Sequence, residues 1–408
     1  MMHETESRER QRSSRCRWWV VVGALLFVAC GTDAPGPDGE SVVTVSPDAV
    51  HALATLDLVA RVVDIQPTSD GRVWVLNSVA PYFIVLGPNG QLERQFGERG
   101  GGPEEFGRPV ALVRGVDPAN IWTYDWGRNA LIRISAGDRR ELALPRDSIP
   151  IPSLVSFKGA GINPAPPWLE STRDGFLLAR ARVSQYESAL HLWNADILLV
   201  RADGSEMSVN LHTPLADVLG DPTSRYGAAT ILIPYPLWTV CADGTIGLYD
   251  PLANTLRRFT SAREELGAIA LPDERQLQMT ANLVFEMFYR QLAEDVPSAR
   301  IPEKEEMRRQ TEEQNNQFVR SSADFFPEYA DLRCTPDGTL WLQPFDVTTG
   351  RLGQGSDWLR ISEDGSHTLV ALPHAFRTFR IERDRIWGTV RDALGVESIA
   401  WVELDSAR

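Results

Sequence analysis

The chain has little lysine, histidine or cysteine, and each shortage argues against a class of function. Lys158 and Lys304 are the only lysines, and the formal net charge is −14. A surface with this acidic balance repels phosphate backbones, which argues against nucleic acid as a partner. The six histidines show no metal-ligand spacing and suggest no Ser/His/Asp order. This argues against a copper or zinc enzyme that needs several histidines around its axis.

The chain also lacks a hydrophobic run long enough to span a bilayer. The apolar stretch 18–29 follows five arginines, and this order is typical of a secretory signal. Its end, Leu-Leu-Phe-Val-Ala-Cys-Gly at 25–31, resembles a bacterial lipobox, which implies that Cys30 is lipidated and becomes the new N-terminus. Residues 1–29 are therefore predicted to be a lipoprotein-type signal peptide. The alternatives are plain secretion or an uncleaved anchor.

The predicted lipid anchor sets the expected location. A multiply acylated Cys30 holds a protein on a membrane without any spanning helix. Gly31 resembles the outer-membrane sorting pattern, so we expect a bacterial cell-envelope protein that faces the periplasm or is exported. Residues 30–41 are small and polar, which is typical of a flexible tether. The removed segment carries five Arg and three Glu, so the formal charge changes from −14 to about −16.

Two cysteines remain once the signal and the lipid site are set aside. Cys16 lies in the signal, which leaves Cys241 and Cys334 in an oxidising compartment. Both lie at the end of a predicted first strand in neighbouring repeats, so a disulfide is possible if their Cα atoms come within roughly 7 Å. Their offsets from the following aspartate differ by one residue, which favours two free buried thiols. Both interpretations stay open.

A turn followed by a strand centred on tryptophan recurs along the chain. The clearest copies place Trp74, Trp122, Trp341 and Trp387 after Asp-Gly, Asp-Pro or Arg-Asp pairs. Self-similarity of this kind is typical of repeat architectures. A tryptophan in mid-strand can bury on the order of 200 Å² between neighbouring repeats. These four residues are therefore predicted to form the structural core of the repeats and not a ligand cage.

Each repeat resolves into four short strands, which predicts an all-β fold, a six-bladed β-propeller with four-stranded blades over residues 42–408. The blades are expected at 58–96, 109–144, 167–211, 236–260, 329–372 and 376–404. The sixth supplies only three strands. We predict that an N-terminal strand at 42–46 closes this last blade, because it would otherwise present a bare edge.

Two sequence patterns resemble those of a known family. Asp125-x3-Asn129-x3-Arg133 and Asp250-x3-Asn254 lie between predicted second and third strands, and a glycine-rich connector spans 96–109. They resemble the NHL-like six-bladed β-propellers of bacterial envelope lipoproteins. The resemblance implies the fold and leaves the activity open, because such propellers host unrelated functions.

The long connections are expected on one face of the propeller. Turns between first and second, and between third and fourth, strands are short. The long segments are 97–108, 145–166, 181–195, 212–235, 261–328 and 344–356. Insertions on one face of a repeat array often mark a binding face. Because the tether enters from the short-turn side, we expect the decorated face to look away from the membrane.

Two of these segments invite closer interpretation. Residues 272–328, between blades four and five, carry an apolar stripe near helical period from Leu277 to Leu292, which predicts a helical insertion. A helical hairpin there either packs on the propeller rim or serves as a lid or docking surface. The glycine run 97–102 is not a phosphate-binding loop, because no Lys-Ser/Thr follows it.

Carboxylates near the axis carry the one enzymatic alternative. Asn77, Asp125 and Asp250 end equivalent strands, and Asp64 lies on an inner strand. They could hold Ca2+ at the channel mouth, as the resemblance to six-bladed lactonases implies. The same side chains could instead cap their own loops.

The sequence favours a non-catalytic binding or scaffold module without a cofactor. We expect a monomer that presents its loop-rich face to a protein, peptide or glycan and is held to a membrane through Cys30. The alternative is a metal-dependent hydrolase of the lactonase type, with Ca2+ at Asp64, Asp125 and Asp250.

Overall fold

The computed structural model describes the repeats in separate stretches of the chain. These are residues 41–55, 61–115, 117, 119–135, 140–143, 172, 175–181, 195–211, 237–272, 282–283, 285–286, 289, 303–322, 328–345, 357–362, 364–392 and 396–404. The predicted signal peptide, lipidation site and tether at 1–40 lie outside the described residues. Within the described part no helix is long and apolar enough to cross a membrane.

Antiparallel sheets follow one another along the chain, and we number them by repeat. Sheet one is β3 (Val62–Pro67), β4 (Val73–Asn77), β5 (Phe83–Leu86) and β6 (Leu92–Phe96). Sheet two is β9 (Pro109–Arg114), β10 (Ile121–Asp125), β11 (Ala130–Arg133) and β12 (Arg140–Ala143). Sheet three is β13 (Phe176–Ala181), β14 (Ala195–Arg201) and β15 (Glu206–Leu211).

The second half of the chain continues the pattern. Sheet four is β16 (Leu237–Val240), β17 (Ile246–Asp250), β18 (Thr255–Phe259) and β19 (Glu265–Ala270). Sheet five is β20 (Tyr329–Cys334), β21 (Leu340–Pro344), β22 (Trp358–Ile361) and β23 (His367–Ala371), with β1 (Ser41–Thr44) added outside β23. Sheet six is β24 (Phe376–Ile381), β25 (Arg385–Arg391), β26 (Glu397–Glu403) and β2 (Val50–Thr55).

Burial along the strands follows their position within a sheet. In sheet one every residue of β4 and β5 is buried, because both faces of these middle strands are covered. The outer strand β6 has four exposed residues and one half-buried residue. This is why the Val-, Ile- and Trp-rich stretches form the middle strands and the charged stretch Leu92–Phe96 forms an edge.

Five hydrophobic clusters join the sheets into a closed series. Sheets one and two share a cluster, and sheets two, three and four share another. Further clusters join sheets four and five, five and six, and six and one. The last of these brings Phe379 and Trp387, near the C-terminus, against Ile65 and Val75, near the N-terminus. Sheets stacked radially in this way form an all-β propeller.

The four repeat tryptophans lie in these clusters. Trp74, Trp122, Trp341 and Trp387 are at most 8% exposed. Each is on the second strand of its sheet and belongs to the cluster that the sheet shares with the next one along the chain. The repeated residue is therefore the contact by which one sheet packs on its successor.

The predicted number of six four-stranded blades is not confirmed. Five sheets have four or more strands, and sheet three has only three among the described residues. Its first described strand, β13, follows the turn that joins Thr172 O to Gly175 N. The predicted start of this blade, at residue 167, falls outside the described residues.

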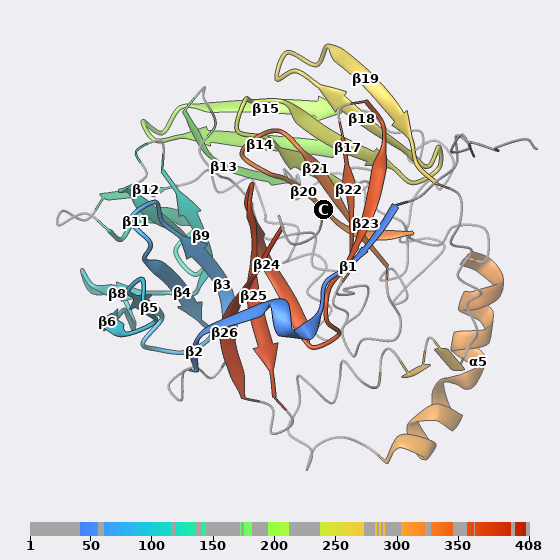
Figure 1. Ribbon diagram of the computed structural model, residues 1–408, viewed down its shortest axis with the longest axis horizontal. Coiled ribbons are helices and arrows are strands. Elements are labelled where there is room, and N and C mark those ends of the chain that lie inside the picture. Colours follow the sequence, from blue (N-terminus) through green and yellow to red (C-terminus); the bar gives the residue numbers. More distant parts are fainter. Residues whose placement is uncertain are drawn as a thin grey trace, which may run out of the picture. The chain divides into compact units, whose positions relative to one another are not determined.

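The N-terminal closure uses a different segment from the predicted one. The strand that completes sheet six is β2, whose Val50 to Thr55 pair antiparallel with Val402 to Ser398 of β26 (Figure 1). The predicted strand 42–46 is wrong in this role, because β1 pairs parallel with β23 of sheet five. The first segment is rich in valine and the second in alanine, and pattern alone does not decide which edge each covers.

The long connection between sheets four and five begins later than the predicted residue 261. β19 occupies Glu265–Ala270 as the fourth strand of sheet four, after a short turn at 260–264. The helix α5 (Lys304–Ser322) lies within the predicted insertion 272–328. The apolar part of the expected hairpin falls largely outside the described residues, so the helical hairpin itself is not confirmed.

Candidate functional site

The innermost strands of sheets six, one and two meet around Arg380. Its guanidinium donates from Nη2 to Asp64 Oδ2 at 3.0 Å and to Leu112 O at 2.6 Å, and from Nε to Ile65 O at 3.0 Å. Arg380 is 6% exposed and Asp64 is 1% exposed. A single side chain from the last repeat therefore bonds the first two repeats.

Three hydrogen bonds from this chain hold the Asp64 carboxylate. Its Oδ1 accepts from the Ile65 amide at 2.8 Å, and its Oδ2 accepts from the Leu112 amide at 2.8 Å as well as from Arg380. Burial raises the pKa of this carboxyl, although Arg380 and the two amides oppose the shift. The arrangement makes Asp64 a structural acceptor within the ring.

Arginines on the inner strands of sheets two and five form two further ion pairs. Arg114 of β9 pairs with Glu382 at 2.5 Å and donates to Pro67 O at 2.9 Å. Arg333 of β20 pairs with Asp331 at 2.9 Å and donates to Phe379 O at 2.6 Å. Burial raises the pKa of Asp331, with Arg333 opposing it. Together with Arg380 these arginines form the axial clamp, which joins sheets five, six, one and two.

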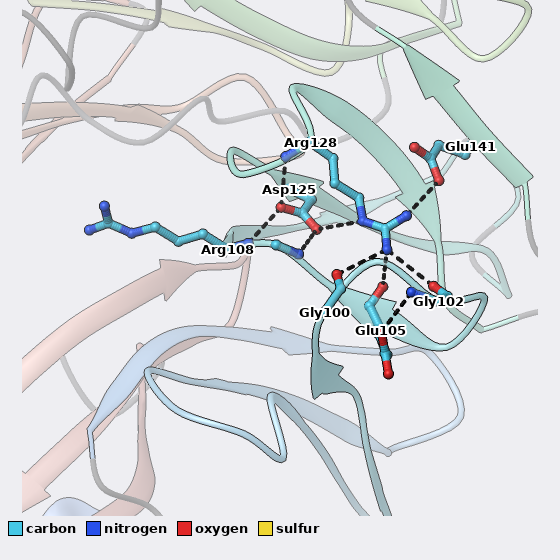
Figure 2. Close-up of polar contacts among 8 residues, drawn as sticks. Gly100, Gly102, Glu105, Arg108, Asp125, Arg128 and Glu141 are labelled. Atoms are coloured by element: carbon cyan, nitrogen blue, oxygen red, sulfur yellow. Dashed lines mark hydrogen bonds and ion pairs between the residues drawn. The ribbon is translucent and has the colours of Figure 1, made fainter.

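Asp125 lies elsewhere, at the end of β10, where it caps the connector between sheets one and two (Figure 2). Its two carboxylate oxygens accept from the amides of Gly107 and Arg108, both at 2.7 Å. The side chain is fully buried. The carboxylate is therefore fixed by the backbone that it holds.

Arg128, from the same loop as Asp125, clamps the other end of this connector. Its Nη2 donates to the carbonyls of Gly100 at 3.2 Å, Gly102 at 3.1 Å and Glu105 at 2.8 Å (Figure 2). The Glu105 carboxylate accepts from the Gly102 amide at 2.6 Å. The short strands β7 (Glu98–Arg99) and β8 (Glu105–Phe106) pair within the connector. We call residues 97–108 with these contacts the clamped connector.

The clamped connector has no vacant amide cradle of the kind that binds phosphate. The amides of Gly102, Gly107 and Arg108 already bond carboxylates of this chain. The Gly100 amide donates to Phe106 O at 3.0 Å. A phosphate would have to displace the carboxylates of Glu105 and Asp125 from these amides. The glycine run therefore has a structural role in the connector.

Asp250 and Asn77 cap loops in a similar manner. Asp250 Oδ1 accepts from the amides of Leu252 at 3.0 Å and Ala253 at 3.3 Å. Asn77 Oδ1 accepts from the Arg61 amide at 3.4 Å. Asn129 and Asn254, which end the Asp-x3-Asn patterns, have φ of 48° and 45°, a left-handed conformation that asparagine tolerates. The pattern is thus a loop signature.

The three candidate metal ligands are not brought together. Asp64 lies in the axial clamp, while Asp125 and Asp250 each cap a separate loop. Among the described residues no group of three or more His, Cys, Asp or Glu side chains is placed to hold a metal ion.

Cys241 and Cys334 form a disulfide between sheets four and five. Their Cα atoms are 5.2 Å apart, and 93 residues separate them along the chain. Cys241 follows β16 and Cys334 ends β20, both inner strands. The offset of one residue, which favoured free thiols, does not prevent the bond, because the two Cα atoms still lie within the distance that a disulfide spans.

The connections at the two ends of the strands differ in length. Connections from first to second and from third to fourth strands are short wherever described: 68–72, 87–91, 115–120, 202–205, 241–245, 260–264, 335–339, 362–366 and 382–384. We call this side the short-turn face. Among the described strands, the long connections 97–108, 182–194, 212–236, 271–328 and 345–357 join the opposite strand ends, where short ones such as 126–129 and 251–254 also lie. We call that side the long-connection face.

Sequence reasoning missed Arg380 and Arg128, which organise the two clusters. Arg128 lies three residues after Asp125 in a turn rich in polar groups, and this spacing was a usable signal. Arg380 had none, because its partners lie 268 to 316 positions away along the chain.

No protein-family model and no curated protein matches this chain. Among solved structures, virginiamycin B lyase from Staphylococcus aureus is 12% identical and covers 86% of this chain and 87% of its own, with a TM-score of 0.41. Regucalcin from Agrobacterium tumefaciens is 11% identical over 89% and 96%, with a TM-score of 0.41. A Bacteroides fragilis protein thought to be exported is 12% identical over 89% and 99%, with a TM-score of 0.49. Identities and scores this low carry no argument about activity.

Proposed function

We propose that this protein is a non-catalytic binding module of the bacterial cell envelope. Its partner, a protein, peptide or glycan, docks on the long-connection face. The observation that supports this proposal is the position of five long connections, 97–108, 182–194, 212–236, 271–328 and 345–357, which join the same ends of the described strands. Segments added on one side of a repeat array extend a surface without disturbing the core that carries it.

The hydrogen bonds that Asp64, Asp125 and Asp250 make within the chain favour a structural role for these carboxylates. A general base or a metal ligand needs a free lone pair aimed at substrate or ion. Asp64, Asp125 and Asp250 each bond amides of this chain. The clamped connector, held by Asp125 and Arg128, adds a fixed contact surface to the proposed docking side.

We also propose the remaining details of the fold and location. Sheet three counts as a sixth blade, as in the NHL-like propellers that the chain resembles. Cys30 carries the lipid, and the protein is a monomer on the outer membrane facing the periplasm.

Site-specific photo-crosslinking in intact cells tests the docking side. A photoreactive residue replaces Glu104 on the clamped connector or, as the matched control, Asn89 in the 87–91 turn of the short-turn face; both positions are exposed. We expect a discrete crosslinked adduct from position 104 and none from position 89. Adducts at 89 alone, or none at 104 and at further long-connection positions, would contradict the proposal.

A further inference from the structure

The strand β1 fixes the side on which the chain enters the propeller. β23 begins directly after the 362–366 turn, so its first residues lie at the short-turn face. β1 runs parallel to β23, with Ser41 opposite Thr368 and Thr44 opposite Ala371. The Ser41 and Thr368 hydroxyls are 2.7 Å apart, and the Val45 amide donates to Ala371 O at 2.9 Å. The chain therefore arrives at Ser41 from the short-turn face.

The distance from this entry point to the predicted anchor is limited by chain length. Residues 31–40 separate Cys30 from Ser41. A fully extended chain spans at most about 3.3–3.6 Å per residue, so this tether reaches roughly 35 Å. With Cys30 in a bilayer, Ser41 and the short-turn end of sheet five stay within that range.

The short-turn face carries an excess of carboxylates. Its described turns expose these aspartates: Asp70, Asp117, Asp203, Asp243, Asp337, Asp364 and Asp384. Glu264 adds to them, whereas the exposed cations in the same turns are Arg72, Arg263 and Arg383. Hydrogen bonds from neighbouring hydroxyls lower the pKa of Asp70, Asp203 and Asp364, so these groups are ionised at neutral pH.

We propose that the short-turn face is the membrane-proximal face and that it fits a zwitterionic lipid surface better than an anionic one. The proposal rests on the lipid anchor at Cys30 put forward above. It deepens the proposed function, because it directs the long-connection face into the periplasm. An anionic bilayer repels the turn carboxylates over about 10 Å at 0.1 M salt and lifts this face toward the limit of the tether.

Energy transfer on vesicles tests the orientation. The mature chain has no free thiol once Cys30 is acylated and Cys241 is bonded to Cys334, so a single introduced cysteine takes the label. Fluorophores at Asn89→Cys and Glu104→Cys occupy opposite faces, separated by about 17 Å, the length of a five-residue strand. The lipidated full-length protein is bound to phosphatidylcholine vesicles that contain an acceptor-labelled lipid.

We expect about twofold more transfer from position 89 than from position 104, because the shorter distance to the bilayer belongs to the short-turn face. Adding phosphatidylglycerol at low salt should reduce transfer from position 89, and raising the salt should restore it. Equal transfer from both positions, greater transfer from 104, or no response to phosphatidylglycerol would overturn the proposal.

The controls separate this proposal from the docking function. Cys30→Ser should abolish vesicle binding. If the wild-type chain does not bind vesicles, or if Cys30→Ser binds equally, the anchor and the orientation both fail. Crosslinking at Glu104 needs no membrane geometry, so the proposed docking function survives either failure and is overturned only by its own experiment.

Discussion

Aspartates in this protein have two contrasting environments. Asp64 and Asp331 are buried beside arginines of the axial clamp, and burial raises the pKa of each. Aspartates in the short turns are exposed and accept hydrogen bonds from residues two positions away, as Asp70 does from Thr68 at 2.5 Å. The first group depends on charge pairing in a dry interior, whereas the second depends on local geometry in water.

The axial clamp predicts a large effect of removing one cation. Arg380→Met leaves the Asp64 carboxylate buried beside an apolar chain, so we expect the free energy of unfolding to fall by about 3–5 kcal/mol. Urea denaturation measures the change. Arg72→Met is the matched control, because Arg72 forms two ion pairs at the surface, where solvent screening makes its loss much less costly. Equal effects would show that the clamp is not structural.

The aspartates of the short turns predict that the free energy of unfolding depends on pH. The hydroxyls of Thr68 and Ser366 bond Asp70 and Asp364 and hold the pKa of each carboxyl below its ordinary value of 3.8. Because the folded value lies below the unfolded one, these turns stabilise the protein above about pH 4 and lose this contribution as the pH falls. Asp70→Asn with Asp364→Asn should therefore flatten the loss of unfolding free energy between pH 5 and 2. A curve parallel to the wild type would contradict this assignment.

Residue roles were predictable where partners are close in sequence. The capping by Asp250 follows from the Asp-x3-Asn spacing, because its bonded amides lie within three residues, whereas the bonds of Asp125 to the Gly107 and Arg108 amides span 17 to 18 residues. The role of Arg380 was not predictable, since its acceptors belong to strands that meet it only after the ring closes. Long-range partners are fixed by register and blade order, which local pattern does not contain.

At the scale of elements, the two N-terminal strands each cover the edge of a different sheet. β2 completes sheet six, and β1 covers the outer edge of sheet five. The sequence predicted an N-terminal strand that closes the last blade and assigned it to 42–46. The hydrophobic patterns of the two segments are similar, and the choice depends on which edge each can reach after the turn at 45–49.

Truncation separates the two strands. A mature chain beginning at Val50 loses β1, whose four residue pairs with β23 should be worth about 1–3 kcal/mol. A chain beginning at Arg61 also loses β2 and exposes the whole edge of β26, so we expect it not to fold cooperatively. Circular dichroism during heating measures both. Cooperative melting of the shorter chain would show that β2 is dispensable.

The disulfide between sheets four and five predicts sensitivity to reduction. It closes a loop of about 90 residues, and in the loop-entropy description its loss should cost about 3–5 kcal/mol. Dithiothreitol should lower the melting temperature of the wild type and leave a Cys241→Ala, Cys334→Ala variant unchanged. An identical response of the two proteins would mean that the bond is absent in solution.

At the scale of the whole molecule, the five clusters make each sheet depend on its neighbours. Trp74, Trp122, Trp341 and Trp387 each pack in a cluster that their sheet shares with a neighbouring sheet. Repetition made the architecture predictable from the sequence. The number of complete blades was not predictable, because the repeats around Leu178 and Gly247 both lack the tryptophan, yet sheet four has four described strands and sheet three has three.

The proposed function predicts that a chelator does not change the thermal stability of the protein. If no bound ion supports the fold, EDTA should leave the melting temperature unchanged, and added Ca2+ should not raise it, because a ligand stabilises only the state that binds it. Differential scanning fluorimetry with both additions measures this. A fall under EDTA that Ca2+ reverses would instead favour the metal-dependent hydrolase alternative.

Arg380 has a consequence for how the protein is made. Its guanidinium neutralises a carboxylate, Asp64, that leaves the ribosome some 316 residues earlier. Before Arg380 has been synthesised, the Asp64 carboxylate has no cation to pair with, and burying it is unfavourable. We therefore expect the first repeat of the nascent chain to stay open until the last repeat has been synthesised.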